Sequence, residues 1–148
     1  MLELKDISFY LSHELQVMTV SNSIGTIRGY DRSLIYLNDC IVSQTILSGL
    51  KPILTKLSDF TEADWMEVFK AGFGIVELEL RVDHKCETIT GRGNGISCVF
   101  YYVDLEFNCV FGTFNQHKAF QKIYELKGDV NNLIGKGLAI DKKTLEIK

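Results

Sequence analysis

The spacing of apolar residues along the chain changes near residue 59, which predicts two differently built halves. In the first half, short apolar stretches alternate with turn-forming residues, a pattern typical of short strands. These strands are expected at residues 15–20, 26–30, 33–37, 40–45 and 52–56. A short helix capped by Asp6 is expected before them, through Leu11. Because closure removes the unpaired edges of so small a sheet, we expect a partly closed barrel of SH3-like or Sm-like type.

The second half begins with a complete set of residues that start a helix. Thr61 can cap it and Asp64 can return the capping-box bond, so a helix is expected over residues 62–71. Alternation of apolar and charged residues then predicts a strand with one face in water, and two further apolar segments predict its neighbours. The strands of this antiparallel sheet are expected at residues 75–82, 96–103 and 105–111, with the second one central.

The end of the chain is expected to be helical and then extended. Thr113 can cap a helix that runs through Lys127, and Asp129 can cap a shorter one. Gly135 and Gly137 are expected to turn the chain, because left-handed backbone positions favour glycine. The fold class is therefore α+β, with a barrel-like subdomain at residues 1–58 and a sheet carrying two or three helices at residues 59–148.

Composition and charge narrow the possible partners. The chain has 148 residues, of which 46% are hydrophobic, and its formal net charge is −3. Residues 1–58 hold five basic and five acidic residues, and residues 59–148 hold eleven and fourteen, so the two parts carry 0 and −3. Neither part has the excess of positive charge that is needed to bind a polyanion, which disfavours nucleic acid as a partner. We keep nucleic-acid binding only as a minor alternative.

The location is expected to be the cytoplasm. The N-terminal residues lack the basic start and long apolar core of a secretory signal, and the longest apolar run with strand chemistry, residues 96–103, falls short of the roughly 20 residues that span a bilayer. No membrane association is therefore expected. The four cysteines, at positions 40, 86, 98 and 109, have no short paired spacing, so we expect buried reduced thiols.

The glycine-rich segment Gly91-Arg92-Gly93-Asn94-Gly95 is the most suggestive chemical motif. Glycines let backbone amides approach a phosphate, and Arg92 can add a charged contact. The segment lies between two expected strands rather than before a helix, which favours a hairpin loop over a phosphate site. Gly91, Arg92, Gly93 and Asn94, with the nearby Tyr101, form the expected contact for a ligand or a partner protein.

Other combinations of reactive residues carry weaker predictions. His84, Cys86 and Cys98 supply three metal-ligand types, but without the paired spacing of a zinc site, so no metal is expected. A cysteine nucleophile beside His84 or His117 needs spatial proximity that the sequence does not give. The carboxylates of Glu77, Glu79 and Asp83 favour a solvated strand face over magnesium binding or acid–base catalysis. No catalytic residue and no cofactor are therefore assigned.

Three short motifs give the chain a resemblance to a known family. They comprise residues 4–7 with Tyr10-Leu11, residues 50–54 with 57–59, and residues 133–141, which read Leu-Ile-Gly-Lys-Gly-Leu-Ala-Ile-Asp. In this order they resemble short proteins encoded by phages and prophages of gut Bacteroidetes, over roughly residues 2–59 and 118–145. The function of that family is unknown, so the resemblance implies a biological context and no reaction.

These observations lead to two principal hypotheses. The first is a non-catalytic phage or prophage accessory protein that binds a host protein or another host component in the bacterial cytoplasm. The second is a protein that binds or sequesters a small ligand such as a nucleotide signal, with Arg92 and its neighbours at the pocket. A hydrolase that uses Glu77, Glu79, Asp83 or His84 is the least favoured alternative. A homodimer is also plausible, because exposed strand edges and aromatic-rich strands form self-complementary interfaces.

Overall fold

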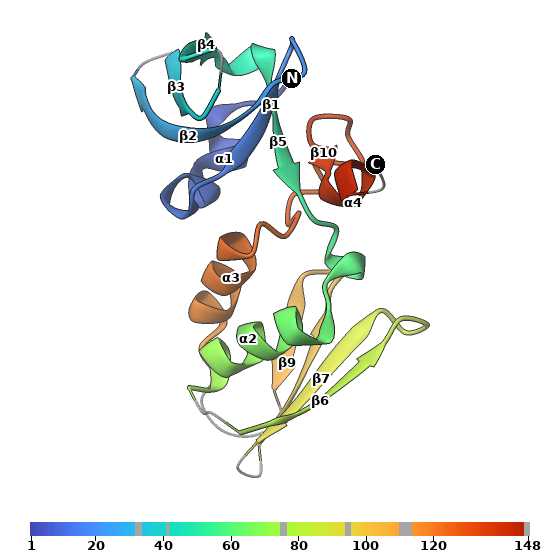
Figure 1. The fold of residues 1–148 in the computed structure, drawn as a ribbon. Coiled ribbons are helices and arrows are strands. Elements are labelled where there is room, and N and C mark those ends of the chain that lie inside the picture. The colour runs from blue at the N-terminus through green and yellow to red at the C-terminus, as the bar shows by residue number, and fades with distance from the viewer. Residues whose placement is uncertain (32–33, 41, 75–76, 94–95, 110–113, 147–148) are drawn as a thin grey trace. The chain divides into compact units, whose positions relative to one another are not determined.

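The computed structural model describes residues 1–31, 34–40, 42–74, 77–93, 96–109 and 114–146. The chain divides into two compact units, drawn in Figure 1. Unit 1 consists of Met1–Lys56 together with Asn131–Lys148, and unit 2 consists of Leu57–Val130. The division expected from the sequence left the C-terminal segment in the second subdomain. In the structure this segment belongs to unit 1, because its strand joins the sheet of that unit.

Unit 1 is built around one six-stranded sheet. Its elements in chain order are α1 (Leu4–Ile7), the 3-10 helix η1 (Ser8–His13), β1 (Gln16–Thr19), β2 (Ile24–Asp31), β3 (Leu34–Asn38), β4 (Gln44–Ile46), the 3-10 helix η2 (Leu47–Gly49), β5 (Leu50–Leu54), β10 (Ile140–Asp141) and α4 (Lys142–Glu146). The strand order is β10-β5-β1-β2-β3-β4, and every pair except β10–β5 is antiparallel.

The sheet of unit 1 is open, so the prediction of a barrel was wrong. Closing the first five strands into a barrel would have paired the free edge of β5 with β4. That edge of β5 is instead paired in parallel with β10, with Ile140 opposite Ile53 and Asp141 opposite Leu54. The edges of the sheet are the short strands β4 and β10. Short edge strands are one way in which a sheet limits its exposed backbone without closing.

The three sequence motifs meet in unit 1, except for residues 57–59 of the second motif, which belong to unit 2. The first forms α1, the second supplies β5, and the third leads into β10. The Asn131 side chain donates a hydrogen bond to the Asp6 carbonyl (3.3 Å), and Lys56 forms an ion pair with Asp141 (3.6 Å). Gly137 has a φ of +73°, which confirms its expected left-handed conformation, whereas Gly135 does not have the positive φ expected of it. The motifs therefore have a structural role in joining the two ends of the chain.

Unit 2 is a four-stranded antiparallel sheet with two helices. Its elements are the 3-10 helix η3 (Leu57–Asp59), α2 (Glu62–Phe73), β6 (Glu79–Asp83), β7 (Thr88–Gly93), β8 (Ile96–Tyr101), β9 (Glu106–Cys109) and α3 (Gln116–Glu125). The strand order is β6-β7-β8-β9, so β8 is an inner strand, as its apolar sequence predicted. With the sheet and helices of both units, the α+β class is confirmed.

The helices of unit 2 begin at side-chain caps. The Asp64 amide donates to the Thr61 hydroxyl (3.2 Å), and the Thr61 amide donates to the Asp64 carboxylate (2.9 Å), which confirms the capping box of α2. Helix α3 begins at Asn115, whose side-chain oxygen accepts from the Lys118 amide (3.1 Å). The cap expected at Thr113 lies outside the described residues.

Both helices of unit 2 pack on the same face of the sheet, which we call the inner face (Figure 1). Its core is rich in aromatic rings: those of Phe100 and Phe107 stack with centroids 4.1 Å apart, and Trp65 of α2 lies 5.5 Å from Phe100. Phe120 of α3 meets Phe107 edge-on at 5.4 Å. Because Trp65, Phe100 and Phe107 are almost completely buried, this packing supplies much of the hydrophobic stabilisation of unit 2.

Strand β7 was not predicted, because its glycines and polar residues favour a loop. Gly91 lies on the inner face and is buried, and a Cβ at that position would lie 2.4 Å from Cδ1 of Phe69. The absent side chain therefore leaves room for the Phe69 ring of α2 against the strand. Gly91, Arg92 and Gly93 belong to a strand and not to the expected hairpin loop, whereas Asn94 and Gly95 lie outside the described residues.

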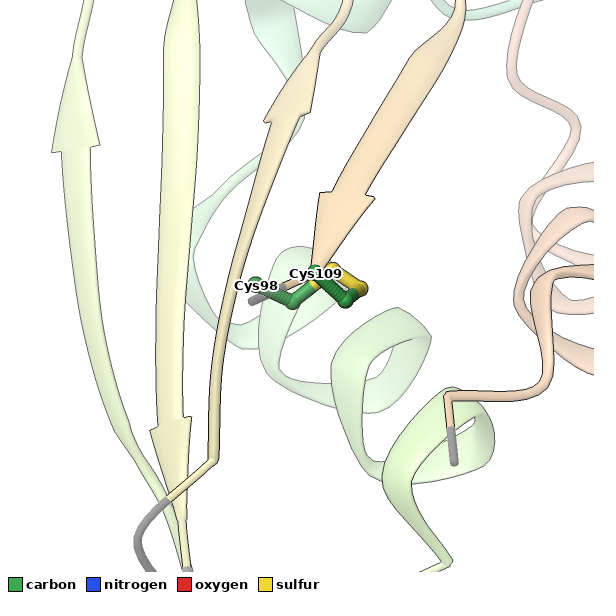
Figure 2. The surroundings of a disulfide bond; sticks show 2 residues. All are labelled: Cys98 and Cys109. Atoms are coloured by element: carbon green, nitrogen blue, oxygen red, sulfur yellow. A yellow bond between two sulfur atoms is a disulfide. The ribbon is translucent and has the colours of Figure 1, made fainter. Parts of the chain in front are cut away.

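Two cysteines of unit 2 form a disulfide bond, which corrects the expectation of four reduced thiols. Cys98 on β8 lies directly opposite Cys109 on β9, and their sulfur atoms are bonded (Figure 2). Cys98 is fully buried in the inner face, whereas Cys40 and Cys86 are free. The eleven-residue separation gave no indication of this bond, because the pairing depends on the register between the two strands.

In the part of the chain that the structure describes, none of the helices combines the length and the apolar character needed to cross a bilayer.

Candidate functional site

The face of the unit 2 sheet opposite α2 and α3 is the candidate functional site, and we call it the outer face. The strand register places eleven side chains on it: Glu79, Arg81, Asp83, Thr88, Thr90, Arg92, Ser97, Val99, Tyr101, Glu106 and Asn108. All of them are exposed or half-buried. Among the described residues of unit 2, no helix or strand covers this face, because both helices pack on the inner one.

The middle of the outer face is a row of four side chains, one from each strand. Thr90, Val99 and Asn108 lie side by side across three strands, with Arg81 at the end of the row on β6. Thr90 and Val99 are half-buried, while Arg81 and Asn108 are exposed. Thr90 and Val99 are β-branched residues, which suit a pleated surface, and they form an uncharged centre bordered by polar and charged groups.

The residues that the sequence proposed as a contact lie on different faces of the sheet. Arg92 and Tyr101 lie on the outer face, and 38% of Tyr101 is exposed. Gly91 lies on the inner face, where it accommodates Phe69, and therefore offers no contact to a ligand. Arg92 pairs with Ser97, four residues before Tyr101 on β8, so the rise per residue separates Arg92 and Tyr101 by about 13 Å. They belong to one surface but not to one small pocket.

A shallow pocket of about 680 Å³ lies around Arg92 at one end of the outer face. It is lined by Glu77, Leu78, Glu79, Arg92, Gly93, Ile96 and Ser97. Arg92 is directly opposite Glu79 in the β6–β7 pair. The two carboxylates outnumber the single guanidinium, so a phosphate placed here would meet net negative charge. The pocket favours a neutral or basic group over a nucleotide.

The turn between β6 and β7 lies at the opposite end of β6. The Asp83 carboxylate accepts hydrogen bonds from the backbone amides of Lys85 (3.0 Å) and Cys86 (3.1 Å). The hydrogen bond from the Cys86 amide is the main reason why the pKa of Asp83 is lowered. Hydrogen bonding to Asp83 raises the pKa of the Cys86 thiol, so this thiol remains protonated and is a poor nucleophile.

His84 and Tyr102 form a further polar contact beside this turn. The distance between Nδ1 of His84 and the Tyr102 hydroxyl is 3.4 Å. Burial raises the pKa of Tyr102, and the negative charges of Glu87 and Asp83 raise it further. The neutral phenol is therefore the form that contacts His84 at ordinary pH.

The sequence candidates for metal binding and acid–base chemistry do not converge. Cys98 is bonded to Cys109 and buried, so it cannot join His84 and Cys86 as a ligand. Glu79 and Asp83 are separated by four residues of β6, about 13 Å. Within the described ranges, no group of three or more His, Cys, Asp or Glu side chains is placed to hold a metal ion.

Sequence reasoning missed most of the outer face. Because β7 was not predicted, the expected sheet lacked the strand that connects Arg81 on β6 with Val99 on β8. The usable indication was the alternation in Thr88-Ile89-Thr90, where a single apolar residue lies between two β-branched polar ones.

The comparisons with known proteins found no matching family model, no matching curated protein and no matching solved structure.

Proposed function

We propose that the chain is a non-catalytic accessory protein of a phage or prophage and binds a host protein through the outer face of unit 2. The observation that carries the proposal is the composition of this face: Arg81, Arg92 and Tyr101 are exposed around half-buried Thr90 and Val99. Arginine and tyrosine are enriched at protein interfaces, where they act as anchors. The phage context rests on the resemblance of the three sequence motifs.

The charges of the outer face support a protein partner over nucleic acid. Two arginines, Arg81 and Arg92, are interspersed with three carboxylates, those of Glu79, Asp83 and Glu106. A phosphate backbone would be repelled by these carboxylates, whereas a protein surface can present both signs of charge. We therefore propose a partner with basic groups that face Glu79 and Glu106, and an acidic or carbonyl group that faces Arg92.

The proposed place of action is the cytoplasm of the bacterial host. Disulfide bonds are rare in that compartment because the thiol pool keeps cysteines reduced. The proposal therefore requires that unit 2 stays folded when the Cys98–Cys109 bond is reduced. Partner binding that survives reduction would support the cytoplasm, whereas binding that is lost on reduction would indicate an oxidising compartment.

The test is a pull-down from host lysate with the full-length chain as bait, quantified by mass spectrometry. Tyr101→Ala and Arg92→Ala should each weaken the affinity for the same host protein by about thirtyfold, and so reduce its recovery, since anchor residues contribute at least about 2 kcal/mol. Arg28→Ala removes an arginine from unit 1, where it contacts the Tyr36 ring, and serves as the control. Equal recovery by all the variants would exclude the outer face as the contact.

A second candidate function is binding of a small ligand at the pocket around Arg92. The volume of about 680 Å³ lies within the range of ligand pockets, which favours this alternative. Its two carboxylates point to a neutral or cationic ligand. Native mass spectrometry of the purified chain tests it directly: extra mass that disappears on denaturation, and that is absent from Arg92→Ala and Glu79→Gln, would support this function over protein binding.

A further inference from the structure

Unit 1 contains an apolar pocket, which is not part of the candidate functional site on unit 2. Its volume is about 410 Å³. Four segments build it: the N-terminal residues, the end of β1 with the following turn, the junction of η2 and β5, and the segment that enters β10. The lining residues are Met1, Leu2, Met18, Thr19, Val20, Asn22, Ser48, Gly49, Leu50, Lys51, Leu138 and Ile140.

The pocket has a buried floor and an exposed apolar rim. Leu2 and Leu50 in the floor are 6% and 4% exposed, whereas Met1 and Val20 at the rim are 91% and 86% exposed. Removing such an exposed apolar rim from water is favourable. The rim therefore favours a ligand that brings apolar surface of its own.

Among the described residues, Lys51 has the only charged side chain that lines the pocket, and no carboxylate side chain lines it. It lies on β5 directly opposite Met18 of β1, and its side chain is exposed. An ammonium group at the edge of an apolar pocket selects a ligand with an anionic end. The hydroxyl of Thr19 is already hydrogen-bonded to Ser21 (2.9 Å), so Lys51 is the charged side chain that can attach an anionic end.

We propose that this pocket binds an amphiphile with an apolar tail and one carboxylate, the chemistry of a free medium-chain fatty acid. The tail would contact Leu50, Leu138 and the rim, and the carboxylate would pair with the Lys51 ammonium group. The pocket volume is near the lower end of the range for small-molecule sites, which fits a single short chain and not a whole phospholipid.

The test is titration calorimetry of the full-length chain with decanoate below its micellar concentration. The wild-type protein should bind one decanoate saturably, and Lys51→Gln should weaken the affinity about tenfold, the loss of roughly one charge-assisted hydrogen bond. Lys5→Gln removes the same charge from the exposed surface of α1 and should leave the affinity unchanged. Val20→Glu places a carboxylate on the rim and should abolish binding without disturbing the buried core.

Two comparison ligands distinguish specific binding of decanoate from non-specific hydrophobic or electrostatic binding. Acetate carries the carboxylate without the tail, and decyltrimethylammonium carries the tail with the opposite charge, so neither should bind. Equal binding of decanoate to Lys51→Gln, or of decyltrimethylammonium to the wild type, would overturn the proposal. So would a wild-type dimer in native mass spectrometry that binds no decanoate and dissociates in Val20→Glu, since a second copy would then cover the pocket.

Discussion

Replacement of Gly91 by alanine tests whether this glycine serves packing in unit 2. An added Cβ would lie 2.4 Å from Cδ1 of Phe69 and 3.0 Å from two further ring atoms. Favourable carbon–carbon contacts occur at about 3.5–4.0 Å, so either the ring or the strand must move by about 1 Å. The Phe69 ring has little space for this shift, because it is fully buried within about 6 Å of the rings of Phe107 and Phe114.

The expected loss of stability follows from this overlap. Overpacking of a filled core typically costs about 1–3 kcal/mol. Alanine restricts the unfolded chain more than glycine does, which offsets about 0.4–1 kcal/mol of the cost. The net destabilisation of Gly91→Ala should therefore be about 1–2 kcal/mol, a fall in melting temperature of roughly 5–15 °C for a unit of this size.

Urea and thermal unfolding, followed by circular dichroism, measure this loss. Gly29→Ala is the matched control: this glycine also lies in a strand, and a Cβ there would meet no atom within 4 Å. Its stability should stay within about 0.5 kcal/mol of the wild type. Phe69→Leu should reduce the penalty of Gly91→Ala in a double-mutant cycle, because the smaller side chain leaves room for the methyl group. A Gly91→Ala protein as stable as the wild type would refute the packing argument.

Three further predictions concern other parts of unit 2. Thr61→Ala should destabilise α2 by about 1 kcal/mol in urea unfolding, while Thr61→Ser should retain the cap; equal stability of all three proteins would exclude a role for this capping box. Thiol titration of the unfolded protein should find two reactive thiols before reduction and four after it, and four thiols before reduction would contradict the bond. Reduction of the Cys98–Cys109 bond should lower the free energy of unfolding by about 3 kcal/mol, as expected for a loop of this length. The folded state lowers the pKa of Asp83 below 3.8, so the contribution of this carboxylate to stability is present above pH 3.8 and is lost as the pH falls through the lowered pKa. Asp83→Asn should therefore flatten that part of the curve of stability against pH. An unchanged curve would show that the stability of the turn does not depend on the charge of Asp83.

Local chemistry determined the elements that depend on neighbours in the chain. The capping box of Thr61 and Asp64 fixed the start of α2, because both partners lie within one helical turn. The apolar sequence of residues 96–103 predicted an inner strand, since only such a strand has neighbours on both sides. The same reasoning predicted the α+β class, and it correctly assigned Gly137 to a left-handed turn.

Tertiary structure decided the features that depend on segments far apart in the chain. The free edge of β5 pairs with β10, so the sheet of unit 1 is open, and no periodicity within residues 1–58 contains that information. Gly91 belongs to a strand because β7 pairs with β6 and β8, and its missing side chain leaves room for Phe69 of α2. Cys98 meets Cys109 because β8 and β9 align in that register. Sequence alone establishes which residues can form strands and helices, whereas strand order and register determine which of their side chains share a surface.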